Sequence, residues 1–116
     1  MASEKSAIPP DPLAFIRQCI KGRRLLWTYH VNMRLKTRSI PHAVFFLFSA
    51  VETYEIVESY PGDKYLPSYL VRAEHEEEVF HLLFATDLEN DNVRVVTIYR
   101  PDPEFWTEDF RRRKEP

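Results

Sequence analysis

The sequence predicts an α+β domain in which N-terminal helices pack on a four-stranded antiparallel sheet, with a short C-terminal helix after the sheet. Helix-capping signals and helical spacing of apolar residues mark the first half of the chain, whereas alternation of apolar and polar residues begins near residue 54. The 116 residues, 44% of them hydrophobic, are enough for one core and too few for two. We therefore expect a single domain.

The first helix is expected over residues 12–21. Asp11 can cap its N-terminus, Pro12 suits its first position, and a glycine follows its last residue. Residues 1–10 contain few apolar side chains and a proline pair, so we expect them to form a flexible leader. The domain is then expected to span residues 11–114.

Two further helices are expected before the sheet. After a connector over residues 23–27, a helix should run over residues 28–38, starting from a threonine that can cap it. A proline then suits the start of an apolar helix over residues 41–51. The β-favouring run within that segment, residues 44–48, also fits a buried strand.

The second half of the chain is expected to form the sheet and the last helix. Turn signals separate short alternating segments, and an acidic hairpin tip joins the second and third of them. Asp102-Pro103 repeats the signal of a cap followed by a proline, which predicts a helix from Glu104 to about Arg113. The predicted strands are residues 54–60, 69–74, 79–85 and 93–99.

Composition excludes several classes of function. With two glycines the chain has no glycine-rich phosphate-binding loop, and with Cys19 as its one cysteine it has neither an intramolecular disulfide nor a cysteine-paired zinc site. The apolar runs are too short to span a bilayer, and no export signal opens the chain. We expect a cytoplasmic protein without membrane, metal or cofactor.

Positive charge is concentrated in the first half of the chain. Residues 1–50 carry eight lysine and arginine residues against two acidic ones, whereas residues 51–116 carry eight against 16. No acidic residue interrupts the basic segment 17–38. Such asymmetry can hold a polyanion on one face, although charge alone favours a solvated basic helix beside an acidic sheet.

The strongest candidate site is a stripe on the predicted second helix. His30, Arg34 and Arg38 are spaced four residues apart, so they share one helix face, and apolar residues flank that face on both edges. Histidine can move a proton near neutral pH, and arginine can hold a phosphate through two parallel donors. Without a carboxylate cluster, this set suits metal-independent cleavage of a phosphodiester, in which His30 moves a proton and the arginines stabilise the charged transition state.

Other residues are weaker candidates. His75 and His81 flank an acidic tip, which suggests a metal site, but a solvated tip and a sheet histidine placed cross-strand from Arg72 explain them better. Strand tyrosines can stack on bases or contact phosphate, although tyrosines in strands more often pack at the half-buried surface. The basic run 111–114 can be an electrostatic anchor, and we favour a frayed tail.

Four segments together resemble an uncharacterised family of small bacterial and archaeal proteins. The helix motif H-x-x-x-R-M/L-x-x-R-G-I corresponds to residues 30–40, with Ser39 where the family has glycine. The strand motifs I-I-E-x-Y-P and P-S-x-L-V correspond to residues 55–61 and 67–71, and V-x-x-Y-x-P-D-P-x-x-W corresponds to residues 95–106.

This family is similar to RelE- and MqsR-type toxins, which are metal-independent ribonucleases with an α+β fold. The resemblance implies messenger-RNA cleavage and pairing with a small zinc-finger antitoxin-like protein. It implies a catalytic role for His30, Arg34, Arg38 and Tyr99, with Tyr60 as a further strand-end candidate. The apolar run 45–48, which is more polar in the relatives, favours a partner surface or a homodimer.

Two hypotheses follow from these observations. In the first, the domain is an endoribonuclease that cleaves RNA with the catalytic residues named above, and Tyr60, Arg23 and Arg24 bind the substrate. In the second, the domain is a non-catalytic protein-interaction module that binds a partner or a second copy through its third helix, and the basic stripe is neutralised by the acidic sheet.

Overall fold

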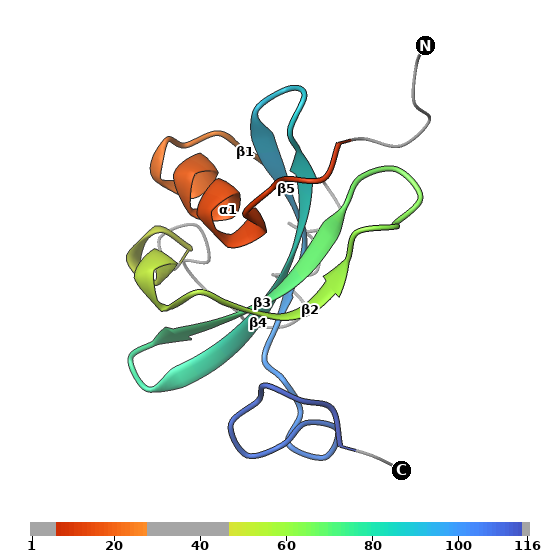
Figure 1. The fold of residues 1–116 in the computed structure, drawn as a ribbon. Helices are drawn as coiled ribbons and strands as arrows, with labels where there is room; N and C mark the ends of the chain where they lie inside the picture. The colour runs from red at the N-terminus through yellow and green to blue at the C-terminus, as the bar shows by residue number, and fades with distance from the viewer. Residues whose placement is uncertain (1–6, 28–46, 115–116) are drawn as a thin grey trace.

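A five-stranded mixed sheet with a helix on one face forms the body of the protein (Figure 1). The computed structural model describes residues 7–27 and 47–114. Within them the strand order is β1-β5-β4-β3-β2, and no helix has the length and apolar character needed to cross a membrane. The elements are α1 (Pro12–Lys21), β1 (Leu25–Trp27), the 3₁₀ helix η1 (Val51–Thr53), β2 (Glu55–Tyr60), β3 (Ser68–His75), β4 (Glu78–Asp87) and β5 (Asn92–Tyr99).

Helix α1 has the predicted bounds and the predicted caps. The Asp11 carboxylate accepts a hydrogen bond from the Ala14 amide at 3.1 Å, and the Gly22 amide donates to the Gln18 carbonyl at 2.9 Å. The left-handed residue after the helix is Arg23, with φ of 59°, rather than the glycine. The helix buries Ile16, Cys19 and Ile20 in one core with side chains of the central strands.

The prediction of four antiparallel strands was wrong because the predicted connector contains a fifth strand. Strand β1 pairs in parallel with β5, Leu25 opposite Val93 and Trp27 opposite Val95. A strand of three residues is too short to show alternation, and its partner lies near the other end of the chain. The sheet is therefore mixed, with β1 at one edge and β2 at the other.

The remaining four strands confirm the predicted segments within one to two residues at each end. The β3–β4 hairpin closes through Glu76 and Glu77, both with positive φ (49° and 69°). Positive φ at both central residues is the geometry of a tight hairpin turn that favours Asn-Gly, so glutamates occupy strained positions here.

The predicted second helix, residues 28–38, lies outside the described residues, as does the first part of the predicted third helix. Residues 47–49 are helical, and η1 follows directly. Leu47 and Ala50 are buried, and the Tyr54 hydroxyl donates to the Leu47 carbonyl at 2.9 Å. The described end of the third helix therefore packs into the core.

The predicted C-terminal helix is absent from the fully described stretch 100–114, which forms a loop below the sheet (Figure 1). Asp102 does cap a turn. Its carboxylate accepts a hydrogen bond from the Glu104 amide at 2.8 Å, and its carbonyl accepts from the amides of Phe105 and Trp106. The chain then folds back, and Trp106 forms a bridge with Arg113. Contacts of the loop with the sheet replace the helical hydrogen bonds that the local sequence favours.

Two β-bulges determine which side chains face this loop. In β2, Ile56 pairs with Val71 and Glu58 with Leu70, so Val57 is an extra residue. The alternation of side chains is reset there, and Glu58 and Tyr60 turn to the sheet face opposite α1.

The second bulge has the same effect in β5. Val95 pairs with Phe84 and Thr97 with Leu83, which leaves Val96 as the extra residue. Without it, strict alternation would turn Tyr99 toward α1. Because of the two bulges, both tyrosines from the predicted site lie on the sheet face opposite α1 rather than beneath the helix.

Candidate functional site

Three side chains of the central strands lie in a row on the sheet face opposite α1. Arg72 of β3 is the cross-strand partner of His81 of β4, which in turn is the partner of Tyr99 of β5. Cross-strand partners project from the same face, so the three are neighbours. Together with Trp106 of the C-terminal loop, they form what we call the His81 cluster.

The His81 imidazole is fully buried and makes a hydrogen bond on each side. Its Nε2 lies 2.8 Å from the Phe110 carbonyl oxygen and its Nδ1 lies 3.3 Å from the Tyr99 hydroxyl. Because a carbonyl can only accept, Nε2 carries the proton and Nδ1 accepts from the tyrosine. Burial lowers the pKa of His81, so the ring is neutral at pH 7.

The C-terminal loop covers this row of side chains. Trp106, 3% exposed, packs edge-on against His81 with 4.4 Å between ring centroids. The Arg72 Nε donates to the Asp109 carbonyl at 2.8 Å. Arg113 closes the stack, with its guanidinium carbon 4.8 Å from the Trp106 ring centroid.

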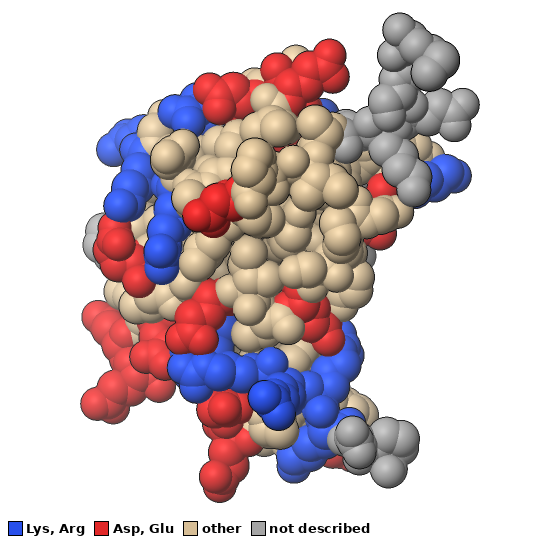
Figure 2. All heavy atoms as spheres, in the orientation of Figure 1, with Lys and Arg blue, Asp and Glu red and all other residues tan. Residues whose placement is uncertain are grey.

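Two bidentate ion pairs bind the loop to strand β2. Arg111 reaches Glu55 at 2.8 and 2.9 Å, and Arg113 reaches Glu58 at 2.7 and 3.1 Å. The hydrogen bonds from Arg111 and Arg113 lower the pKa of Glu55 and of Glu58, respectively. The expectation of a frayed basic tail was therefore wrong. Figure 2 shows lysine and arginine side chains gathered with acidic ones around this loop.

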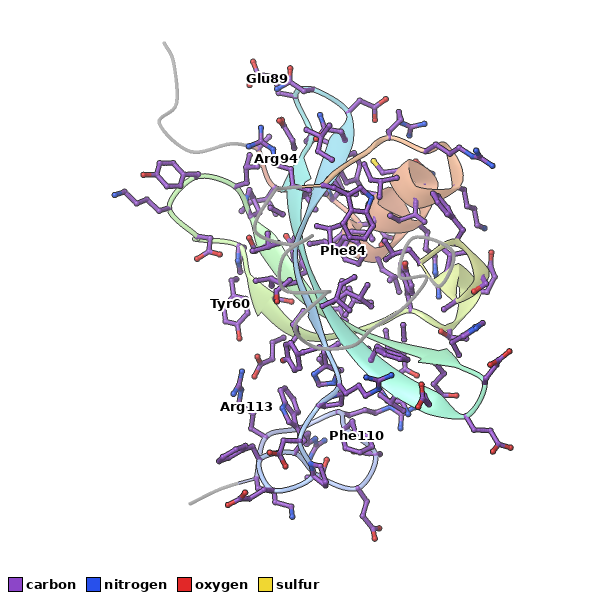
Figure 3. All side chains as sticks on the ribbon, turned by 180° about the vertical axis from the view of Figure 1, so that it is seen from behind. Tyr60, Phe84, Glu89, Arg94, Phe110 and Arg113 are labelled. Carbon is purple, nitrogen blue, oxygen red and sulfur yellow. The ribbon has the colours of Figure 1, made fainter. Side chains whose placement is uncertain are left out.

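Tyr60 extends the ion pair at the end of β2. Its hydroxyl donates to the Glu58 carboxylate, and this hydrogen bond is the main reason that the pKa of Tyr60 is raised. Tyr60 and Arg113 lie one above the other at the same edge of the molecule (Figure 3). Tyr60 is 39% exposed, and the side chain of Arg113 is 58% exposed.

The His81 cluster and the exposed group of Tyr60, Glu58 and Arg113 differ in what they can do chemically. His81 cannot contact a substrate while the loop covers it, so in this arrangement it orients Tyr99. Arg113 is an accessible donor that can hydrogen-bond to a phosphate oxygen, whereas the single hydroxyl proton of Tyr60 is donated to Glu58. Glu58 is ionised at neutral pH, but the donors bound to it make it a weak base.

Of the predicted site residues, Tyr60 and Tyr99 share this face, whereas Arg23 and Arg24 lie between α1 and β1. Arg24 contacts the Asp91 carboxylate at 3.3 Å, at the end of β5 opposite Tyr99. The Arg23 guanidinium lies over the Phe48 ring at 5.6 Å. His30, Arg34 and Arg38 lie outside the described residues.

The described residues contain no group of three or more histidine, cysteine, aspartate or glutamate side chains that could hold a metal ion. His75 is instead close to the Ser49 hydroxyl, with 3.2 Å to its Nδ1, and its Nε2 is 3.9 Å from Glu76. His81 is separated from this tip and engaged by the loop, so the two histidines do not form one site.

Comparison with protein families decides the membership of the chain. Residues 27–100 match the family described as a domain of unknown function (DUF4258). The chain belongs to this family. The DUF4258 match begins at the end of β1 and ends just after β5, so it includes the Arg72–His81–Tyr99 row and excludes the loop with Trp106 and Arg113. Neither the search of curated proteins nor that of solved structures gave a match.

Sequence reasoning missed the His81 cluster as a unit. One signal was present, because a histidine interrupts the apolar run of β4. A buried polar side chain in a central strand needs partners, and a tryptophan and several arginines follow the last strand. Their docking depends on tertiary contacts that the local sequence does not encode.

Proposed function

We propose that this DUF4258 domain is a metal-independent endoribonuclease related to RelE- and MqsR-type toxins. His30 acts as general acid or base, Arg34 and Arg38 hold the scissile phosphate, and Tyr99 and Tyr60 contact the substrate. A small zinc-finger antitoxin-like protein would be its partner, and a homodimer is the other assembly that the sequence favours. The domain would act on RNA in the cytoplasm.

The observation that best supports this proposal is the pairing of the acidic half of the chain. The rival hypothesis requires the sheet carboxylates to neutralise the stripe of His30, Arg34 and Arg38. Yet eight carboxylates of residues 51–116 already contact lysine or arginine side chains outside this stripe. The pairs are Glu52–Lys21, Glu55–Arg111, Glu58–Arg113, Glu74–Arg72, Glu78–Arg100, Asp87–Arg94, Asp91–Arg24 and Asp109–Arg111.

The position of the tyrosines also supports the proposal. Tyr60 and Tyr99 share the sheet face opposite α1 because each strand contains a bulge. Bulges often re-aim side chains near active sites. Support for the interaction module is weaker, because Leu47 and Ala50, at the end of the apolar third helix, are buried in the core of the same chain.

The reaction needs no metal ion. The 2′-oxygen attacks the adjacent phosphorus, the bond to the 5′-oxygen breaks, and the products carry a 2′,3′-cyclic phosphate and a 5′-hydroxyl. His30 moves the proton to or from these oxygens, which contributes about 10²–10⁴-fold to the rate. The arginines stabilise the charge that develops on the phosphate oxygens.

The test is incubation of the purified protein with RNA in the presence of a chelator, with analysis of the product ends. We expect cyclic-phosphate ends from the wild type and loss of cleavage in the variant that combines His30→Ala with Arg34→Ala. Arg112→Ala, which removes an exposed cation elsewhere, is the matched control and should retain cleavage. Absence of cleavage by the wild type, or equal cleavage by the double variant, would refute the proposal.

A further inference from the structure

A shallow groove lies on the upper part of the same sheet face, beside the loop that joins β2 to β3. Its volume is about 350 Å³, within the usual range of about 300–1,000 Å³ for small-ligand sites. Arg94, at its β5 side, is labelled in Figure 3 in the upper half of the molecule. The described lining residues are Asp63, Lys64, Tyr65, Leu66, Ser68, Ala85, Arg94 and Val96, and we call this the Tyr65 groove.

Two apolar side chains of the Tyr65 groove are exposed to solvent instead of packing into the core. Tyr65 is 75% exposed, although a tyrosine ring carries a large apolar surface. Val96 is 37% exposed because it is the extra residue of the β5 bulge. An exposed aromatic ring beside a sheet surface is the platform on which single-stranded bases stack.

Two basic side chains line the groove. The Lys64 ammonium lies 5.3 Å from the centroid of the Tyr65 ring, so a cation and a stacking surface are adjacent. The described lining contains two cations, Lys64 and Arg94, against one carboxylate, Asp63. The Asp87 carboxylate lies beside Arg94, so a phosphate group meets Lys64 directly and meets Arg94 once that side chain turns from Asp87.

Arg94 is available for such a contact. Its Nη2 lies 3.5 Å from the Asp87 carboxylate, a long distance for an ion pair, and its side chain is 47% exposed. That carboxylate also accepts hydrogen bonds from the Asn90 amide at 3.2 Å and from the Asn90 side chain at 2.9 Å. Asp87 thus keeps its partners when Arg94 turns to a phosphate.

We propose that the Tyr65 groove binds one nucleotide of single-stranded RNA, with the base stacked on Tyr65 and the phosphate held by Lys64 and Arg94. This inference rests on the proposed function and names a substrate subsite for it. Tyr60 is the cross-strand partner of Ser68, which lines the groove. An RNA strand that leaves the groove across this strand pair reaches Tyr60 next.

The test measures binding separately from cleavage. The probe is a fluorescein-labelled decauridylate in which every 2′-hydroxyl is methylated, so that cleavage through the 2′-oxygen is blocked. Fluorescence anisotropy gives its dissociation constant for the full chain over a series of salt concentrations. Circular dichroism verifies that each variant is folded.

Tyr65→Ala should weaken binding by about 5- to 150-fold, the usual effect of losing one stacked base. Tyr65→Phe keeps the stacking surface and should bind within about twofold of the wild type. Phe105→Ala removes another aromatic ring, 59% exposed, outside the groove and is the matched control. Lys64→Ala should lower the salt dependence of log K by about 0.7, whereas Lys114→Ala should leave it unchanged.

Equal affinities of Tyr65→Ala and Phe105→Ala would overturn the inference, as would failure of the wild type to bind the probe at low salt. The latter is the result expected if the groove takes a protein segment instead. The two proposals fail separately. Binding that depends on Tyr65 without cleavage of unmodified RNA refutes the ribonuclease and keeps the subsite. Cleavage of unmodified RNA that is insensitive to Tyr65→Ala, together with unchanged probe binding, refutes the subsite and keeps the ribonuclease.

Discussion

Acidification from pH 7.0 to pH 5.5 should destabilise the fold through His81. The ring is fully buried and neutral, with burial as the main cause of its lowered pKa. Arg72 and Arg113 oppose its protonation, and Glu58 favours it. In the unfolded chain the same side chain has an ordinary pKa of about 6.5 and takes up a proton on acidification. The unfolded state then binds more protons than the folded state, so the free energy of unfolding falls as pH falls.

The size of this effect follows from the linkage relation. One proton that is bound only in the unfolded state changes the free energy of unfolding by at most about 1.4 kcal/mol per pH unit. Since the unfolded histidine is largely neutral at pH 7.0 and largely protonated at pH 5.5, the total loss is at most about 1.3 kcal/mol. The stability is fully present above pH 6.5 and is lost as pH falls toward the folded pKa.

Urea denaturation at pH 7.0, 6.0 and 5.5 measures this loss for the wild type and for His81→Gln. The variant lacks the titrating ring, so the difference between the two free energies should shrink toward lower pH. The other histidines of the chain are the same in both proteins, so their contributions cancel in the difference. Glu55 and Glu58 have lowered pKa values, so their effects arise below this range. If the free energies of unfolding of wild type and variant changed in parallel with pH, the folded state would not oppose protonation of His81, and the reasoning would be wrong.

Three further predictions concern stability. A double-mutant cycle with Glu58→Gln and Arg113→Gln should give a coupling free energy of about 0.5–1 kcal/mol, a small value because the arginine is more than half exposed to solvent. The coupling should vanish as Glu58 is protonated below its lowered pKa, and zero coupling at pH 7 would contradict the docked loop. Replacing Glu76-Glu77 by Asn-Gly should raise the free energy of unfolding by about 1 kcal/mol, because both glutamates have positive φ. The Gln-Gln control removes the charge but keeps the side chains at these positions, so it should not reproduce the gain. Tyr54→Phe should cost about 1–3 kcal/mol in thermal or urea denaturation, because the buried Leu47 carbonyl loses its donor, and an unchanged midpoint would show that this hydrogen bond contributes nothing.

Sequence patterns predicted the elements whose signals are local. Asp11 and Pro12 defined α1, and alternation defined four strands. The expected cross-strand relation of His81 to Arg72 was confirmed, because the two strands pair in an adjacent hairpin with a short turn. In each case a few neighbouring residues carry the information.

Features that depend on distant contacts were not predictable in this way. Strand β1 is identifiable only through its pairing with β5. The bulges at Val57 and Val96 reverse the facing of Tyr60 and Tyr99, and a strictly alternating pattern gives no sign of them. The C-terminal segment has a genuine cap at Asp102, yet contacts with the sheet override the helix that this cap favours.

The parallel pairing of β1 with β5 has a consequence for synthesis of the chain. Helix α1 and β1 leave the ribosome first, but the strand that β1 joins is the last one made. Strands β2 to β5 form from successive hairpins with short-range contacts, so they can assemble before β1 is added. At about 5–20 residues per second, the apolar side of α1 waits on the order of several seconds for its sheet. During that time, Ile16 and Ile20 are available to chaperones or to other nascent chains.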